Sequence, residues 1–189
     1  EKHDLRNLTL IGHSMGGNLA TEVAAAMPER VKQLIIVDAI PCMRALMMPG
    51  VDAKHIRYDS PQVLRMLRMS EDSLRQTVVM TAQNMTLRPE RVDTLVRWMM
   101  RADRETYVYG YTDLLKMDLR PQLDRITAET LILGAPFPDE QVVRENYAKQ
   151  YANLANKSIR MAPDSRHFIM FDQPTWLHEQ INSALTDEK

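Results

Sequence analysis

Residues 10–17 of this chain read Leu-Ile-Gly-His-Ser-Met-Gly-Gly. An apolar run over residues 7–11 leads into this stretch, and an alanine-rich segment with helical spacing, residues 15–27, follows it. We therefore predict a strand that turns sharply into a helix at Ser14. Leu19, Ala20, Val23, Ala24 and Met27 are expected on one face of that helix, whose alanine content allows it to pack close to a sheet.

The predicted turn suits a nucleophilic serine. A serine hydroxyl reacts only when a base is positioned beside it and its oxygen is exposed to the substrate, and a strand-to-helix turn provides that exposure. The residues two before and two after the serine must be small where the chain folds back on itself, and they are Gly12 and Gly16. At the helix N-terminus, the backbone N–H of Met15 is placed to donate to an oxyanion.

A parallel sheet with flanking helices is the expected fold. Pro28 ends the first helix, and residues 31–37 form a second, nearly continuous apolar strand of the kind that is covered on both faces. Further strands are predicted at residues 130–134 and 157–162, alternating with helices at 139–154 and 174–185. The chain is therefore of the α/β class, with Trp176, Leu177, Ile181, Ala184 and Leu185 as the buried stripe of its last helix.

The middle of the chain has a different pattern. Residues 41–118 carry no strand signal and contain successive amphipathic helices, so we predict an all-helical cap inserted into a core made of residues 1–40 and 119–189. Ten of the 14 methionines fall in this segment. Their flexible side chains either line an adaptable apolar pocket or hold the helices together.

The composition excludes several classes of protein. A formal net charge of −1 gives no electrostatic reason to expect nucleic acid or an anionic membrane as a partner. The single cysteine, Cys42, permits no internal disulfide and no cysteine-rich zinc site, and is expected to be buried as a free thiol. No apolar run approaches the length of a membrane span. A small molecule is the expected partner.

The stretch at residues 10–17, with 28–31 and 34–38 after it, resembles the α/β-hydrolase superfamily, in particular its lidded serine esterases and lipases. The resemblance runs from the nucleophile strand to the last helix. It implies a hydrolase that cleaves carboxylic esters or related acyl compounds, with apolar acyl substrates, through an acyl-enzyme on Ser14 and with no metal or organic cofactor. The alternative is a non-catalytic relative that binds a small ligand or a partner.

The resemblance also implies a catalytic histidine after the last strand, in the chain order Ser, acid, His. Only His167 lies there, although Arg166 stands where the family usually has glycine. The remaining histidines are assigned other roles: His13 to packing, and His3, His55 and His178 to the surface.

Two aspartates are candidates for the acid. Asp38 follows the strand after the nucleophile, a position used by pancreatic-type lipases, and it is the favoured choice. Asp139 lies near the more common position, which is here Phe137, but it is also placed to cap the helix that follows. Asp164 and Asp172 are weaker candidates.

The resemblance further implies about 80–100 residues ahead of the nucleophile strand, including a loop that supplies a second oxyanion donor. Only 13 residues precede Ser14, and the chain begins at Glu1 rather than Met. We therefore expect the N-terminal strands, and any targeting segment, to be missing from this sequence. For the same reason the sequence does not predict a cellular compartment. The strand at residues 7–11 is then expected to expose an unpaired edge that favours self-association.

Overall fold

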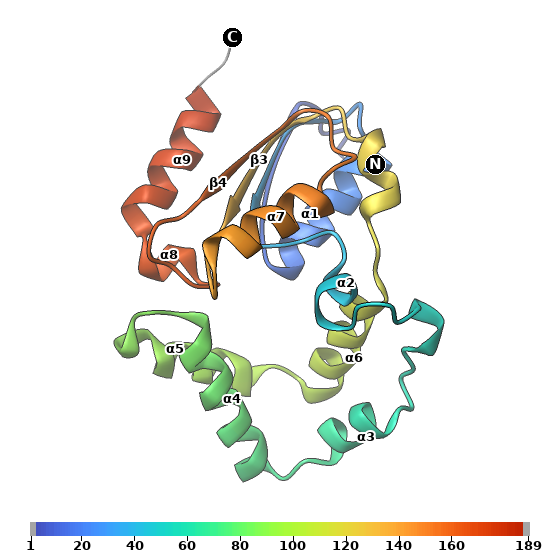
Figure 1. Cartoon of the computed structure of the whole chain (residues 1–189), viewed down its shortest axis with the longest axis vertical. Helices are drawn as coiled ribbons and strands as arrows, with labels where there is room; N and C mark the ends of the chain where they lie inside the picture. Colours follow the sequence, from blue (N-terminus) through green and yellow to red (C-terminus); the bar gives the residue numbers. More distant parts are fainter. Residues whose placement is uncertain (1–2, 187–189) are drawn as a thin grey trace. The chain divides into compact units, whose positions relative to one another are not determined.

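A computed structural model describes residues 3–186 and confirms the predicted α/β class. Its four-stranded sheet is entirely parallel, and its strands follow one another across the sheet in sequence order. The chain divides into two compact units, residues 1–41 with 119–189 and residues 42–118 (Figure 1). The strands are β1 (Leu8–His13), β2 (Val31–Val37), β3 (Glu129–Gly134) and β4 (Lys157–Met161).

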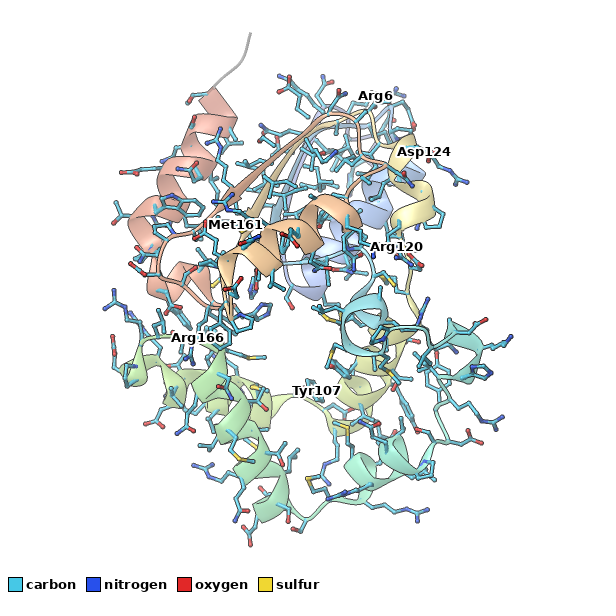
Figure 2. The ribbon with its side chains drawn as sticks, viewed as in Figure 1. Arg6, Tyr107, Arg120, Asp124, Met161 and Arg166 are labelled. Carbon is cyan, nitrogen blue, oxygen red and sulfur yellow. The ribbon has the colours of Figure 1, made fainter. Side chains whose placement is uncertain are left out.

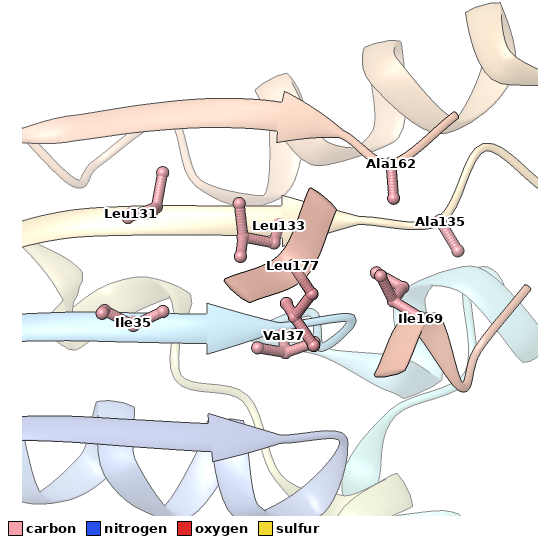
Figure 3. Close-up of a cluster of buried hydrophobic side chains, with 8 residues drawn as sticks. All are labelled: Ile35, Val37, Leu131, Leu133, Ala135, Ala162, Ile169 and Leu177. Carbon is pink, nitrogen blue, oxygen red and sulfur yellow. The ribbon is translucent and has the colours of Figure 1, made fainter. Parts of the chain in front are cut away.

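The sheet is covered by helices on both faces. On one face, α8 (Ile169–Asp172) and α9 (Pro174–Thr186) pack against alternate strand residues, and Figure 3 shows this cluster. The opposite face meets α1 (Met15–Ala26) and α7 (Glu140–Gln150), as the close approaches at Gly17 and Gly134 show. The buried cluster drawn in Figure 3 consists of Ile35, Val37, Leu131, Leu133, Ala135, Ala162, Ile169 and Leu177.

The apolar face predicted for α1 is only partly the face that is buried: Ala24 is buried, Ala20 and Val23 are half-buried, and Leu19 and Met27 are exposed. Leu19 is 53% exposed, whereas the helix buries Gly17, Thr21 and Ala25 together with Asn18 and Ala24. The helix lies so close to the end of β2 that a Cβ added to Gly17 would come within 3.2 Å of the Ile36 side chain in β2 and 2.9 Å of the Ala39 side chain just after it. Small residues must therefore face the sheet, and the larger apolar ones are turned outward.

The other predicted helices differ less from the structure. The helix predicted at residues 139–154 begins one residue later and ends at Gln150, where a turn precedes β4. Leu185 of α9 is exposed rather than buried, while Trp176, Ile181 and Ala184 do pack against the core. A short 3-10 helix, η2 (Arg120–Arg125), leads from the second unit back to β3.

Residues 42–118 contain helices and no strand. Three of the helices begin at a side-chain cap: Ser60, Ser70 and Asp103 each accept a backbone N–H of the first turn. Cys42 is a buried free cysteine, as expected. The elements of this unit are α2 (Met43–Met47), η1 (Ala53–His55), α3 (Pro61–Arg68), α4 (Glu71–Met85), α5 (Pro89–Arg101) and α6 (Arg104–Lys116).

Strand β1 forms one edge of the sheet, and its Ile11 is 50% exposed. Self-association through this edge stays a prediction. Across residues 3–186, no helix is both long and apolar enough to cross a membrane. The same residues bring together no group of three or more histidine, cysteine or acidic side chains suited to a metal ion.

Candidate active site

The strand register gathers the ends of three strands at one edge of the sheet. His13 pairs with Val37, and Val37 pairs with Leu133, so the strands β1, β2 and β3 end level with one another. The residues that follow them are Ser14, Asp38 and, after Gly134, Ala135. In an open parallel sheet this carboxyl edge is where ligands usually bind.

Ser14 lies at the turn between β1 and α1, in a conformation that non-glycine residues rarely adopt (φ 54°, ψ −128°). Its N–H donates to Val37 O at 3.0 Å, which ties the turn to β2. Although Ser14 is in the N-cap position of α1, its hydroxyl makes no capping bond. Backbone strain of this kind persists only where the surrounding structure holds it, and it concentrates at functional sites.

The crowding at this turn differs from the prediction at one of the two glycines. A Cβ added to Gly12 would lie 2.2 Å from Gly16 O, so this position needs glycine as expected. At Gly16 itself an added Cβ meets nothing within 4 Å among the described residues, and the crowded position on the helix is Gly17 instead. The prediction for Gly16 is thus wrong here, because its Cα faces outward while Gly17 faces β2.

This difference predicts unequal effects of two matched substitutions. Gly12→Ala is expected to lower the free energy of unfolding by about 3 kcal/mol or more, since the backbone itself must move. Gly16→Ala is expected to be neutral or to stabilise by up to about 1 kcal/mol, since alanine favours the helix. Urea unfolding of both variants checks this. Equal stabilities would contradict the close contact at Gly12.

The Asp38 carboxylate joins the His167 imidazole. Nδ1 of His167 lies 2.6 Å from Oδ2 of Asp38, and the two side chains are 25% and 16% exposed. The other oxygen, Oδ1, accepts the N–H of Ala135 and the hydroxyl of Tyr147, each at 2.9 Å. Burial acts to raise the pKa of Asp38, but the hydrogen bonds from His167, Ala135 and Tyr147 outweigh it and hold that pKa below its ordinary value. Asp38 is therefore a fixed carboxylate.

None of the other three candidate aspartates forms a hydrogen bond with His167. Asp139 is exposed at the N-cap of α7, where it accepts the N–H of Val142 at 2.9 Å. Asp172 is buried and accepts the N–H of Arg166 at 2.8 Å. Asp164 is an exposed loop residue with a positive φ of 41°.

His13 links the serine turn to the histidine loop. Its Nε2–H donates to the carbonyl oxygen of His167 at 2.9 Å, and the two rings lie 4.6 Å apart between centroids. Burial, and next the positive charge that His167 can carry, lower the pKa of His13 to about 4. The His13 ring is therefore neutral at pH 7. His3, His55 and His178 are exposed, as predicted.

Ser14 and His167 are on adjacent segments, but the structure forms no hydrogen bond between their side chains. Among residues 3–186 the Ser14 hydroxyl has no hydrogen-bond partner at all. Hydrogen bonds between catalytic groups are often long or poorly aligned without substrate and tighten in the substrate complex. The N–H of Met15, as the first residue of α1, has no acceptor within the helix and points from its N-terminus.

The loop that carries His167 is fixed at several points. The hydroxyl of Ser165 donates to Ala162 O at 3.2 Å, and the Arg166 guanidinium, labelled in Figure 2, lies 4.5 Å from the centre of the Phe137 ring. The positive φ in this loop belongs to Asp164, not to Arg166. Arginine is thus accommodated before the histidine because the loop makes its left-handed turn two residues earlier.

Comparison with known proteins places the chain in a family. Residues 1–174 match the model of the alpha/beta hydrolase fold family, and the chain belongs to that family. It is similar to the sn-1-specific diacylglycerol lipase ABHD11 of Danio rerio, with 26% identity over 184 residues. That match covers 94% of this chain and 56% of the relative, so the chain spans little more than half of the length of that protein.

Solved structures show the same fold. A hydrolase from Pseudomonas aeruginosa aligns over 98% of this chain and 67% of its own, with 17% identity and a TM-score of 0.76. An esterase from Exiguobacterium antarcticum aligns over 96% of this chain and 68% of its own, with 20% identity and a TM-score of 0.74. At these identities the likeness concerns the fold.

Sequence reasoning missed two groups at this site. The Ala135 N–H carries no side-chain signal and is set only by the register of β3. Tyr147 had a signal that was not used: with Tyr151, which follows the last residue of α7, it forms an aromatic pair at i and i+4. Both tyrosines are buried.

Proposed function

We propose that this chain carries the catalytic centre of a serine hydrolase of the carboxylesterase or lipase type, with Ser14 as nucleophile, His167 as base and Asp38 as acid. The observation that carries the proposal is the 2.6 Å bond from Nδ1 of His167 to Asp38. It leaves Nε2 of His167 as the nitrogen that accepts a proton. Membership of the hydrolase family and the strained turn at Ser14 support the same assignment.

The mechanism is acyl transfer in two steps. The Ser14 hydroxyl attacks the ester carbonyl while Nε2 of His167 takes its proton, and the alcohol leaves with that proton. A water molecule, deprotonated by the same nitrogen, then attacks the acyl-enzyme; the bond from the acyl carbon to Ser14 Oγ breaks, the carboxylic acid leaves and Ser14 regains its proton from His167. Asp38 holds the ring by Nδ1–H and stabilises the imidazolium that forms in each step. The N–H of Met15 donates to the oxyanion, and no cofactor enters any step.

Small acyl compounds with an apolar part are the substrates that we propose. The helical unit of residues 42–118, which we propose as a cap, contains a mostly apolar cavity of about 130 Å³ with Met66, Met69 and Met99 in its lining. Flexible methionines of this kind suit binding of varied alkyl groups. The diacylglycerol lipase named above is a relative of this class.

Covalent labelling tests the proposal directly. A fluorophosphonate is expected to phosphonylate the purified protein at one site, in the peptide that contains Ser14, because only an activated serine reacts with it. Peptide mass spectrometry identifies the site. Labelling at a different serine, or no labelling while short-chain esters are also left intact, would contradict the proposal.

A second candidate is a family member that binds a small ligand without turnover. It is favoured by one observation, namely that the Ser14 hydroxyl is not bonded to His167 in the structure. Hydrolysis of a nitrophenyl ester that depends on Ser14 excludes this candidate.

A further inference from the structure

We infer that Tyr147 is a positioning residue for catalysis, which turns the Asp38 carboxylate so that its Oδ2 faces His167. This inference rests on the proposed function, since it assigns a role within the same site. Tyr147 lies on α7. It is not part of the sequence segments around Ser14, Asp38 or His167.

The orientation of a carboxylate is set by the donors on its two oxygens. Oδ1 of Asp38 accepts two hydrogen bonds, from the Ala135 N–H and from the Tyr147 hydroxyl, and Oδ2 accepts the one from His167. With both Oδ1 bonds present, rotation of the carboxylate about its last bond would break three contacts at once. Ala135 alone supplies one point of attachment, and the carboxylate is then free to tilt around it.

The fold makes room for the Tyr147 ring at this position. A Cβ added to Gly134, at the end of β3, would lie 3.1 Å from Cζ of Tyr147 and 2.9 Å from the sulfur of Met161, which is labelled in Figure 2. The absence of a side chain at Gly134 therefore lets the phenol reach past β3 to the end of β2. Tyr147 is 4% exposed, so water does not compete for its hydroxyl.

The state of the Tyr147 hydroxyl suits a permanent donor. Burial and next the negative charge of Asp38 raise the pKa of Tyr147 well above its ordinary value, so the phenol keeps its proton at any working pH. A hydrogen bond from a neutral hydroxyl to a buried carboxylate is of the strong, charge-assisted type. Tyr147 thus donates to Asp38 and takes no part in proton transfer.

Tyr151, four residues after Tyr147 and directly after the end of α7, provides a matched control. It is also buried, its ring lies 6.0 Å from that of Tyr147, and its hydroxyl donates to the carbonyl oxygen of Ala39 at 2.9 Å. Tyr151→Phe therefore removes one buried hydroxyl and one hydrogen bond, as Tyr147→Phe does. Only Tyr147→Phe removes a donor from Asp38.

Two measurements on the purified protein test the inference. In Tyr147→Phe, kcat for a nitrophenyl ester is expected to fall about tenfold with KM little changed. A loss of this size is smaller than the full free energy of one charge-assisted hydrogen bond. The proton NMR resonance of the His167 Nδ1–H is expected to move upfield, because a carboxylate that is free to tilt forms a longer and less well aligned bond with Nδ1–H. Tyr151→Phe is expected to leave both kcat and this resonance unchanged.

The two readouts separate this inference from the proposed function. If the unmodified protein does not cleave esters, the proposed function fails. The His167 Nδ1–H resonance still tests the role of Tyr147 in that case. An unchanged resonance in Tyr147→Phe, or an equal shift in Tyr151→Phe, would overturn the positioning role. Absence of the resonance from the unmodified protein would overturn the Asp38–His167 bond on which the role depends.

Discussion

Replacement of Ser14 by alanine is expected to lower kcat for a short-chain nitrophenyl ester by a factor of about 10⁶. The reason is that the acyl-enzyme cannot form without the hydroxyl, whatever His167 and Asp38 contribute. Stability is expected to change little, because the Ser14 hydroxyl neither caps α1 nor bonds any other described residue. Initial rates with thermal unfolding of the same samples measure both quantities.

Ser158→Ala is a suitable control for this experiment. This substitution also removes a serine hydroxyl, but from an exposed position on β4 that is no part of the proposed site. Its activity is expected to equal that of the unmodified protein. Turnover that survives in Ser14→Ala at more than a few per cent would remove Ser14 from the nucleophile role and with it the acyl-enzyme mechanism.

Much of the core follows from local sequence patterns. The β2 segment is nearly all apolar because both its faces are buried, and its limits were predicted correctly at residues 31–37. The turn at Ser14 is equally local, since a strand, a small residue at Gly12 and a helix start all fall within a few residues. Such features need no knowledge of distant contacts.

The errors arise where distant contacts decide the outcome. The buried face of α1 depends on how close the helix lies to Ala39, and hydrophobicity alone selected Leu19 instead. In the same way, no local pattern distinguishes Asp38 from Asp139 as partner of His167, because each follows a strand. The choice depends on the β2–β3 register and on Tyr147, a residue more than a hundred positions away.

Asp38→Asn is expected to lower kcat/KM by a factor of about 10⁴ without loss of the fold. Two donors, the Ala135 N–H and the Tyr147 hydroxyl, occupy Oδ1, and only an oxygen can accept them. The asparagine carbonyl must therefore take that position, and the amide NH₂ is directed at Nδ1 of His167. This forces the ring proton onto Nε2, the nitrogen that has to accept the Ser14 proton.

Asp139→Asn is the matched comparison. Asparagine caps helices as well as aspartate does, so α7 is expected to keep its first-turn bond to Val142 and kcat/KM is expected to change less than about twofold. Steady-state kinetics of both variants, with thermal unfolding as the check on the fold, decide between the two carboxylates. A large loss in Asp139→Asn with a small one in Asp38→Asn would transfer the acid role to Asp139. That result would mean that the bond between Asp38 and His167 is structural and that the histidine loop moves toward α7 before catalysis.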